Sequence, residues 1–91
     1  MQPLAQAIPK VIAELLRTAP NSPGKIEFAW KAAVGPAVAR ATRVHLDGRL
    51  LLVESDNPTW TKEMRRSAPL LLRRMNGLLG QDTIEEISVR A

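Results

Sequence analysis

The sequence predicts an α+β domain, and three observations lead to that expectation. A hairpin signal spans Thr42 to Ser55, where Asp47-Gly48 separates two apolar runs. Apolar residues recur at helical spacing both before and after this hairpin. A last apolar run, Thr83 to Arg90, has the composition of a short strand. We therefore expect helices packed on a small sheet, with Thr83 to Arg90 added to the hairpin as a third strand.

Length and composition bound the possibilities. The 91 residues suffice for one domain with a modest core, and residues 1–19 are expected to be its N-terminal helix. Thirteen Lys and Arg against nine Asp and Glu give a net charge of +4, a mild preference for polyanions. No stretch has the pattern of a secretory signal or a membrane span, so we expect a cytoplasmic protein with no membrane contact.

Leu4 to Ala19 reads as an amphipathic helix. Pro9 removes a backbone donor and clashes one turn back, so the helix is expected to begin with Pro9 in its first turn or to bend there. Two interpretations are open: the helix covers the core, or it detaches and binds a partner. Its apolar stripe consists of Leu4, Ile8, Val11, Ile12, Leu15 and Leu16.

A turn cluster with two prolines, Ala19 to Gly24, precedes a second helix from Lys25 to Val34. Gly35 is placed to end that helix in a left-handed conformation. Pro36 to Arg40 then forms a short helical turn that leads into the hairpin. Trp30 is expected to anchor the core.

The hairpin is expected to turn at Asp47-Gly48, with Leu51 rather than Leu50 as the first core residue of its second strand. This turn would pair Leu46 with Arg49, Val44 with Leu51 and Thr42 with Val53. The core face would then carry Thr42, Val44, Leu46, Leu51 and Val53. The opposite face would carry Arg43, His45, Leu50, Leu52 and Glu54.

A long helix opens near Pro58, after the capping side chains of Ser55 to Asn57. Pro69 predicts a kink or break near Ser67 to Pro69, and Gly77 and Gly80 are expected to end the helix. The apolar positions that should lie on the sheet are Trp60, Met64, Leu71, Met75 and Leu78.

The opposite side of this helix is basic. Asn57 to Gln81 holds five basic residues and one acid, Glu63, whereas Asp82 to Ala91 holds three acids and one Arg. A charge-rich surface of this kind is common in small soluble domains, and it is also the usual form of a polyanion-binding surface. The candidate nucleic-acid contacts are Lys62, Arg65, Arg66 and Arg73, with Arg40, Arg43 and Arg49 as additions.

No catalytic, metal or cofactor site is expected. The chain has no cysteine and one histidine, His45, which alternates onto the hairpin face opposite the core. Glu85 and Glu86 are adjacent and would point to opposite sides of a strand. Gly77-Leu78-Leu79-Gly80 matches the Gly-x-x-Gly loop of K homology domains in form only, because its two leucines indicate a helix end. We therefore expect a non-enzymatic protein.

The order of short motifs resembles the DciA family of bacterial proteins over residues 25 to 90. The residues that carry the resemblance are Trp30, Val34, Gly35, Thr42, Asp47-Gly48, Leu50 to Val53, Trp60, Leu71-Leu72, Met75-Asn76 and Leu79-Gly80. The resemblance implies a K-homology-like fold and a role in DNA replication, namely assistance in loading the DnaB-type replicative helicase. It also implies contact with single-stranded or forked DNA.

By position, Trp30 and Trp60 match the family as aromatic anchors, Gly35 as a helix stop and Gly48 as a turn. Many members continue into a basic tail, while this chain ends at Ala91, so weaker DNA affinity is the expectation for it.

Two functions compete. The first is a DNA-binding accessory protein whose affinity falls steeply with salt and whose base stacking is minor, because few aromatics lie off the core. The second is a protein-interaction module without a direct nucleic-acid role, which docks on its partner through Leu50 and Leu52.

Overall fold

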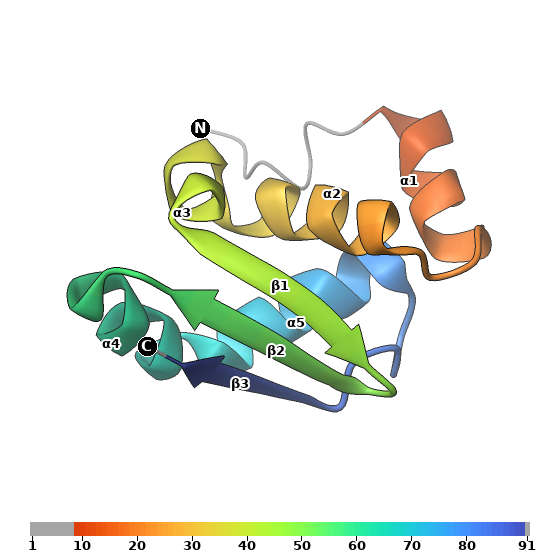
Figure 1. Ribbon diagram of the computed structural model, residues 1–91. Helices are drawn as coiled ribbons and strands as arrows, with labels where there is room; N and C mark the ends of the chain where they lie inside the picture. Colours follow the sequence, from red (N-terminus) through yellow and green to blue (C-terminus); the bar gives the residue numbers. More distant parts are fainter. Residues whose placement is uncertain (1–8, 91) are drawn as a thin grey trace.

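The computed structural model describes residues 9–90, and it confirms the α+β class (Figure 1). The elements are α1 (Lys10–Thr18), α2 (Pro23–Val34), α3 (Pro36–Arg40), β1 (Thr42–Asp47), β2 (Leu50–Ser55), α4 (Pro58–Arg66), α5 (Ala68–Leu79) and β3 (Glu86–Arg90). A K-homology-like assignment is compatible with this order and stays a prediction. Among residues 9–90, no helix has both the length and the apolar character that a bilayer crossing requires.

The sheet has the order β1-β2-β3 and one face covered by helices. β1 and β2 are antiparallel, whereas β2 and β3 are parallel. A parallel partner needs a long crossover, and α4 and α5 supply it. Figure 1 shows α5 behind the strands, so the opposite side of the sheet is open. The third strand is thus confirmed, although it starts at Glu86 and not at Thr83.

The hairpin register differs from the expected one by two residues. Asp47 pairs with Leu50, and Val44 pairs with Val53, so the turn residues are Gly48 and Arg49. Gly48 has a φ of +61° and takes the first central position, where a two-residue hairpin turn of this kind favours glycine. Because the side-chain period of a strand is two, the shift leaves every residue on its expected face. Leu51 is fully buried, as expected.

α1 begins at Lys10, directly after Pro9, so the helix starts where proline allows. Leu4 and Ile8 lie outside the described residues. Leu16 is buried against the core, but Val11 and Leu15 are 67% and 57% exposed. Of the two interpretations, α1 covers the core through one edge only, and it leaves the apolar side chains of Val11 and Leu15 in solvent.

α2 begins at Pro23, two residues earlier than expected, because the Ser22 side chain caps it by accepting from the Lys25 N–H at 3.2 Å. The Lys25 ammonium donates to the Ala19 carbonyl at 2.6 Å and so ties the end of α1 to the start of α2. Gly35 ends α2 with a φ of +88°, as predicted.

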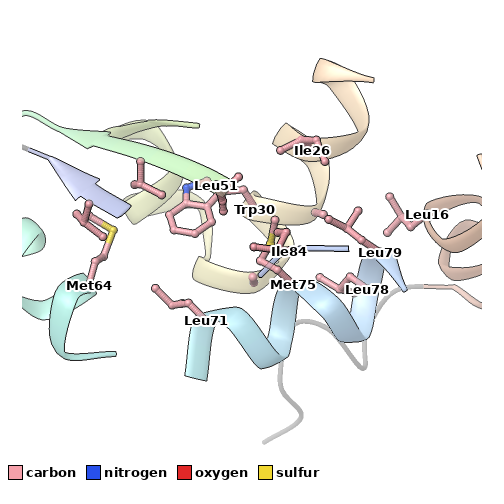
Figure 2. Close-up of a cluster of buried hydrophobic side chains, with 14 residues drawn as sticks. Leu16, Ile26, Trp30, Leu51, Met64, Leu71, Met75, Leu78, Leu79 and Ile84 are labelled. Atoms are coloured by element: carbon pink, nitrogen blue, oxygen red, sulfur yellow. The ribbon is translucent and has the colours of Figure 1, made fainter. Parts of the chain in front are cut away.

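The core joins α2, the inner sheet face and the α4–α5 layer (Figure 2). Trp30 is confirmed as its anchor: the side chain is 2% exposed, and its Nε1 donates to the Thr42 hydroxyl at 2.9 Å. The buried residues that α4 and α5 contribute are Thr61, Met64, Leu71, Met75, Leu78 and Leu79.

The long helix is broken at Ser67, which confirms the expected break, and Met64, Leu71, Met75 and Leu78 are buried as predicted. Trp60 is 36% exposed, so its assignment as a core anchor is wrong. It lies in the first turn of α4, at the edge of that helix's buried stripe, so its side chain is only partly covered. Gly77 lies inside α5, and Gly80 alone ends the helix, with a φ of +116°.

Candidate nucleic-acid interface

Three of the predicted cations form the outer side of α4 and α5. Lys62 and Arg66 are one helical turn apart on α4, and Arg73 lies on α5; all three are exposed. Arg66 approaches Glu63 at 3.8 Å, and both side chains are largely in solvent, so this pair is weak. Lys62 and Arg73 make no ion pair with any residue in 9–90. We call these three residues the α4–α5 basic surface.

Local packing explains why this surface faces outward. Thr61 and Met64 hold α4 against β2 and β3, which leaves the opposite side to water. Asn57 fixes the start of the helix, because its Oδ1 accepts from the N–H groups of Thr59 at 2.8 Å and Trp60 at 3.3 Å. The orientation of the cations thus follows from a cap and two buried side chains.

Arg65, also predicted as a contact, is tied to the sheet. Its Nε and Nη2 donate to the Val89 carbonyl at 3.1 and 3.0 Å, which links α4 to β3. Arg74 behaves similarly, since its Nη1 donates to the Ala33 carbonyl at the end of α2 at 3.1 Å. These bonds fix the position of each guanidinium group and use only part of its donors.

Arg40 and Arg43 lie together on a different side of the molecule. They line a hollow of about 650 Å³ between α2, α3 and the start of β1. Lys31 joins them there, and Glu27 is the acid of the same lining. Trp30 and Thr42 lie at its inner side. The structure therefore brings Arg40 and Arg43 together, but as a site distinct from the α4–α5 basic surface.

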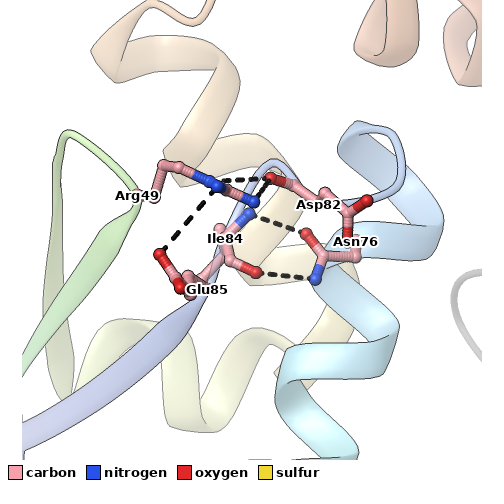
Figure 3. A network of polar contacts seen from close by, with 5 residues as sticks. All are labelled: Arg49, Asn76, Asp82, Ile84 and Glu85. Carbon is pink, nitrogen blue, oxygen red and sulfur yellow. Dashed lines mark hydrogen bonds and ion pairs between the residues drawn. The ribbon is translucent and has the colours of Figure 1, made fainter.

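Arg49 lies at the far end of the hairpin, in an acidic setting (Figure 3). Its Nε and Nη2 donate to the Asp82 carbonyl at 3.1 and 2.8 Å, and Glu85 lies 3.9 Å from its Nη1. The Glu85 N–H donates back to the Arg49 carbonyl at 2.7 Å. Nearby, the Asn76 side chain donates to and accepts from the Ile84 backbone, both at 2.8 Å. This network fixes the loop between α5 and β3.

Leu50 and Leu52 lie on the open face of the sheet, as the alternation predicted, and both are half-buried. The charges around them are segregated. At one end of the face, Glu54 stands between Arg43 and Arg90 in neighbouring strands; at the other, Leu50 stands between Asp47 and Glu86. The apolar centre is thus bounded by a basic and an acidic end.

Two relevant residues escaped prediction. Lys31 gave no local signal, because its role in the hollow depends on how α2 packs beside β1. The partial exposure of Trp60 depends on how the first turn of α4 packs on its neighbours, for which the sequence gives no local signal. An aromatic residue is therefore available at the surface, and the expectation of a core position fails for it.

Comparison with known proteins gives a consistent result. The model of the family described as "Dna[CI] antecedent, DciA" matches residues 3–89. A UPF0232 protein of Streptomyces coelicolor is 33% identical over 89 residues, which cover 94% of this chain and 47% of the relative. A UPF0232 protein of Streptomyces avermitilis is 30% identical over 90 residues, covering 96% and 50%. The chain thus spans about half the length of these relatives. No solved structure gives a significant match.

Proposed function

This chain belongs to the DciA family, and we propose that it is a DNA-replication accessory domain that assists loading of a DnaB-type helicase. In this proposal the domain contacts single-stranded or forked DNA through the α4–α5 basic surface. Family membership supports the helicase-loading role. The DNA contact rests on the arrangement of charges in the chain itself.

The observation that carries the DNA contact is the exposure of Lys62, Arg66 and Arg73 on one helical layer. Their positive charge is only partly offset, by Glu63. The acids Asp82, Glu85 and Glu86 lie in the loop and strand that follow α5, beside Arg49. Segregated charge of this kind raises the local concentration of a polyanion at one side of a protein.

The number of free cations sets the expected strength. Three phosphate contacts to a single strand give a slope of about −2 for log affinity against log salt concentration. Affinity should then fall about 20-fold between about 50 and about 200 mM salt. Contacts limited to phosphates discriminate weakly between sequences, so we expect little sequence preference.

Fluorescence anisotropy with labelled single-stranded and forked DNA tests this contact. Lys62→Glu with Arg73→Glu should abolish measurable binding, because two attractive charges become repulsive. The control with the same change in net charge is Lys10→Glu with Arg17→Glu, two exposed residues of α1 outside the α4–α5 basic surface, which should retain most of the affinity. Equal losses in the two variants would show that net charge, and not this surface, controls binding.

A second candidate function is protein docking without a direct nucleic-acid role. Leu50 and Leu52 favour it, because they form an apolar centre on a sheet face that no described element covers. Capture of a purified DnaB-type helicase discriminates the two functions. Loss of capture in Leu50→Asp alone would indicate apolar docking, whereas loss in Arg66→Glu alone would indicate the basic surface.

A further inference from the structure

A groove follows the outer edge of β1. Its first part is the hollow beside Arg40 and Arg43, and its second is a hollow of about 240 Å³ lined by the start of α2 and the end of β1. Val44 lines both parts, so both border the middle of the strand. α2 forms the other wall from Pro23 to Lys31, and Figure 1 shows it beside β1.

β1 presents free backbone groups to this groove. Asp47 and Leu50 flank a two-residue turn and therefore form a hydrogen-bonded pair. Alternation makes Val44–Val53 and Leu46–Leu51 non-hydrogen-bonded pairs, whose N–H and C=O groups point away from β2. In residues 9–90, no turn, loop or cap hydrogen bond takes up the backbone groups of Val44 or Leu46.

The other edge of the sheet differs. The Val89 carbonyl of β3 is occupied by both donors of Arg65, so pairing with a further strand is obstructed there. Exposed edges are templates for strand addition unless side chains or neighbouring elements block them. On β1 the outward backbone groups of Val44 and Leu46 are unoccupied in residues 9–90, and the groove separates them from α2.

We propose that this groove binds an extended acidic segment of a protein partner, which adds a strand to β1. The backbone groups of Val44 and Leu46 recur every second residue, which is the repeat of an extended polypeptide. The α3 end of the groove is basic, because its lining holds three cations and one acid, namely Lys31, Arg40, Arg43 and Glu27. The acidic residues of the segment would lie at this end.

The distribution of charge favours a polypeptide over a nucleic-acid strand. A single strand carries a phosphate at every nucleotide and gains affinity from cations along its whole path. The second hollow has no Lys or Arg in its lining. Trp30, at the inner side of the first, is buried and bonded to Thr42, so it offers no face for a base. Groove binding of a peptide and DNA binding by α4 and α5 are independent properties.

The test uses ¹⁵N-labelled protein and two synthetic peptides of about ten residues with alternating Val and Thr. One peptide carries three Glu at its N-terminal end and the other carries them at its C-terminal end, because the peptide could pair with β1 in either the parallel or the antiparallel direction. Versions of both peptides with Lys in place of Glu are the controls. One acidic peptide should shift the amide signals of Val44 and Leu46 and slow their hydrogen exchange. The Lys versions should do neither.

Variants separate this site from the DNA contact. The double variant Arg40→Glu with Arg43→Glu should bind the acidic peptide with an affinity lower by about tenfold or more. Arg73→Glu should leave this affinity unchanged. Val44→Pro removes one outward donor and leaves the β2 ladder intact, so it should also weaken binding. The proposal is overturned if none of the peptides shifts these amides, if Glu and Lys peptides bind equally, or if a single-stranded oligonucleotide is what shifts them.

Discussion

The two tryptophans occupy different environments at the residue scale, although both sit in apolar helical patterns. Trp30 is enclosed and bonded through Nε1 to Thr42, whose hydroxyl in turn donates to the Val38 carbonyl at 2.8 Å. Trp60 lies in the first turn of α4 with a third of its surface in water. Their roles in stability should differ accordingly.

Trp30→Ala should lower the free energy of unfolding by about 3 to 5 kcal/mol, because it leaves a large cavity and removes the donor to the Thr42 hydroxyl. Trp60→Ala should cost about 1 kcal/mol, since less apolar surface is lost from the interior. Urea unfolding followed by far-UV circular dichroism measures both. Comparable losses in the two variants would place Trp60 in the core after all.

Lys25 gives the molecule a distinct response to alkaline pH. Burial lowers the pKa of its ammonium group below the ordinary value for lysine. Between the folded and unfolded pKa values the unfolded chain binds more protons, so the free energy of unfolding should rise with pH there. The sequence has no Tyr or Cys to titrate in that range.

The Lys25→Met variant lacks this ammonium group, so its free energy of unfolding should not show that rise with pH. Urea unfolding of both proteins at about pH 8 and about pH 10 measures the difference. The other lysines are present in both proteins, so their titration affects both free energies of unfolding equally. Parallel pH profiles would mean that the Lys25 ammonium is as well solvated in the folded state as in the unfolded chain.

At the scale of elements, α4 depends on its cap. Asn57→Ala should destabilise the protein by about 1 kcal/mol because two N–H groups lose their acceptor, whereas Asn57→Ser should retain most of the stability. Thermal unfolding of both variants tests this. A Ser variant as unstable as the Ala variant would show that the Asn57 side chain does not act as a cap.

Local signals explain why most elements could be predicted. Pro9, Pro36 and Pro58 lie at or next to helix starts, and Gly35 and Gly80 end helices by adopting positive φ, as expected. The errors arise where the local pattern does not decide between two arrangements. The hairpin turn could hold Gly48 first or second, and Trp60 lies at the start of its helix, at the edge of the buried stripe.

The candidate site was less predictable than the fold because it depends on contacts between residues that are far apart in the sequence. Sequence placed Lys62, Arg66 and Arg73 correctly on an exposed side, since they oppose the buried positions of their helices. It could not show that Arg65 would reach the Val89 carbonyl, or that Arg49 would turn toward the Asp82 carbonyl. Both contacts join residues more than twenty positions apart.

At the scale of the whole molecule, basic and acidic side chains are concentrated in separate regions of the surface. The α4–α5 basic surface and the basic end of the β1 groove are separate, and the acids Asp82, Glu85 and Glu86 gather around Arg49 at the far end of the hairpin. The two proposals thus assign a polyanion to the helical layer and a different ligand to the edge of the sheet.

The salt dependence of DNA binding tests the central claim most directly. For the unmodified protein and single-stranded DNA, log affinity against log salt should have a slope of about −2. A variant with Lys62→Gln, Arg66→Gln and Arg73→Gln should lose that slope almost entirely, because the neutralised side chains release no counterions. An unchanged slope in this variant would contradict the account, since the phosphates would then be bound elsewhere on the molecule.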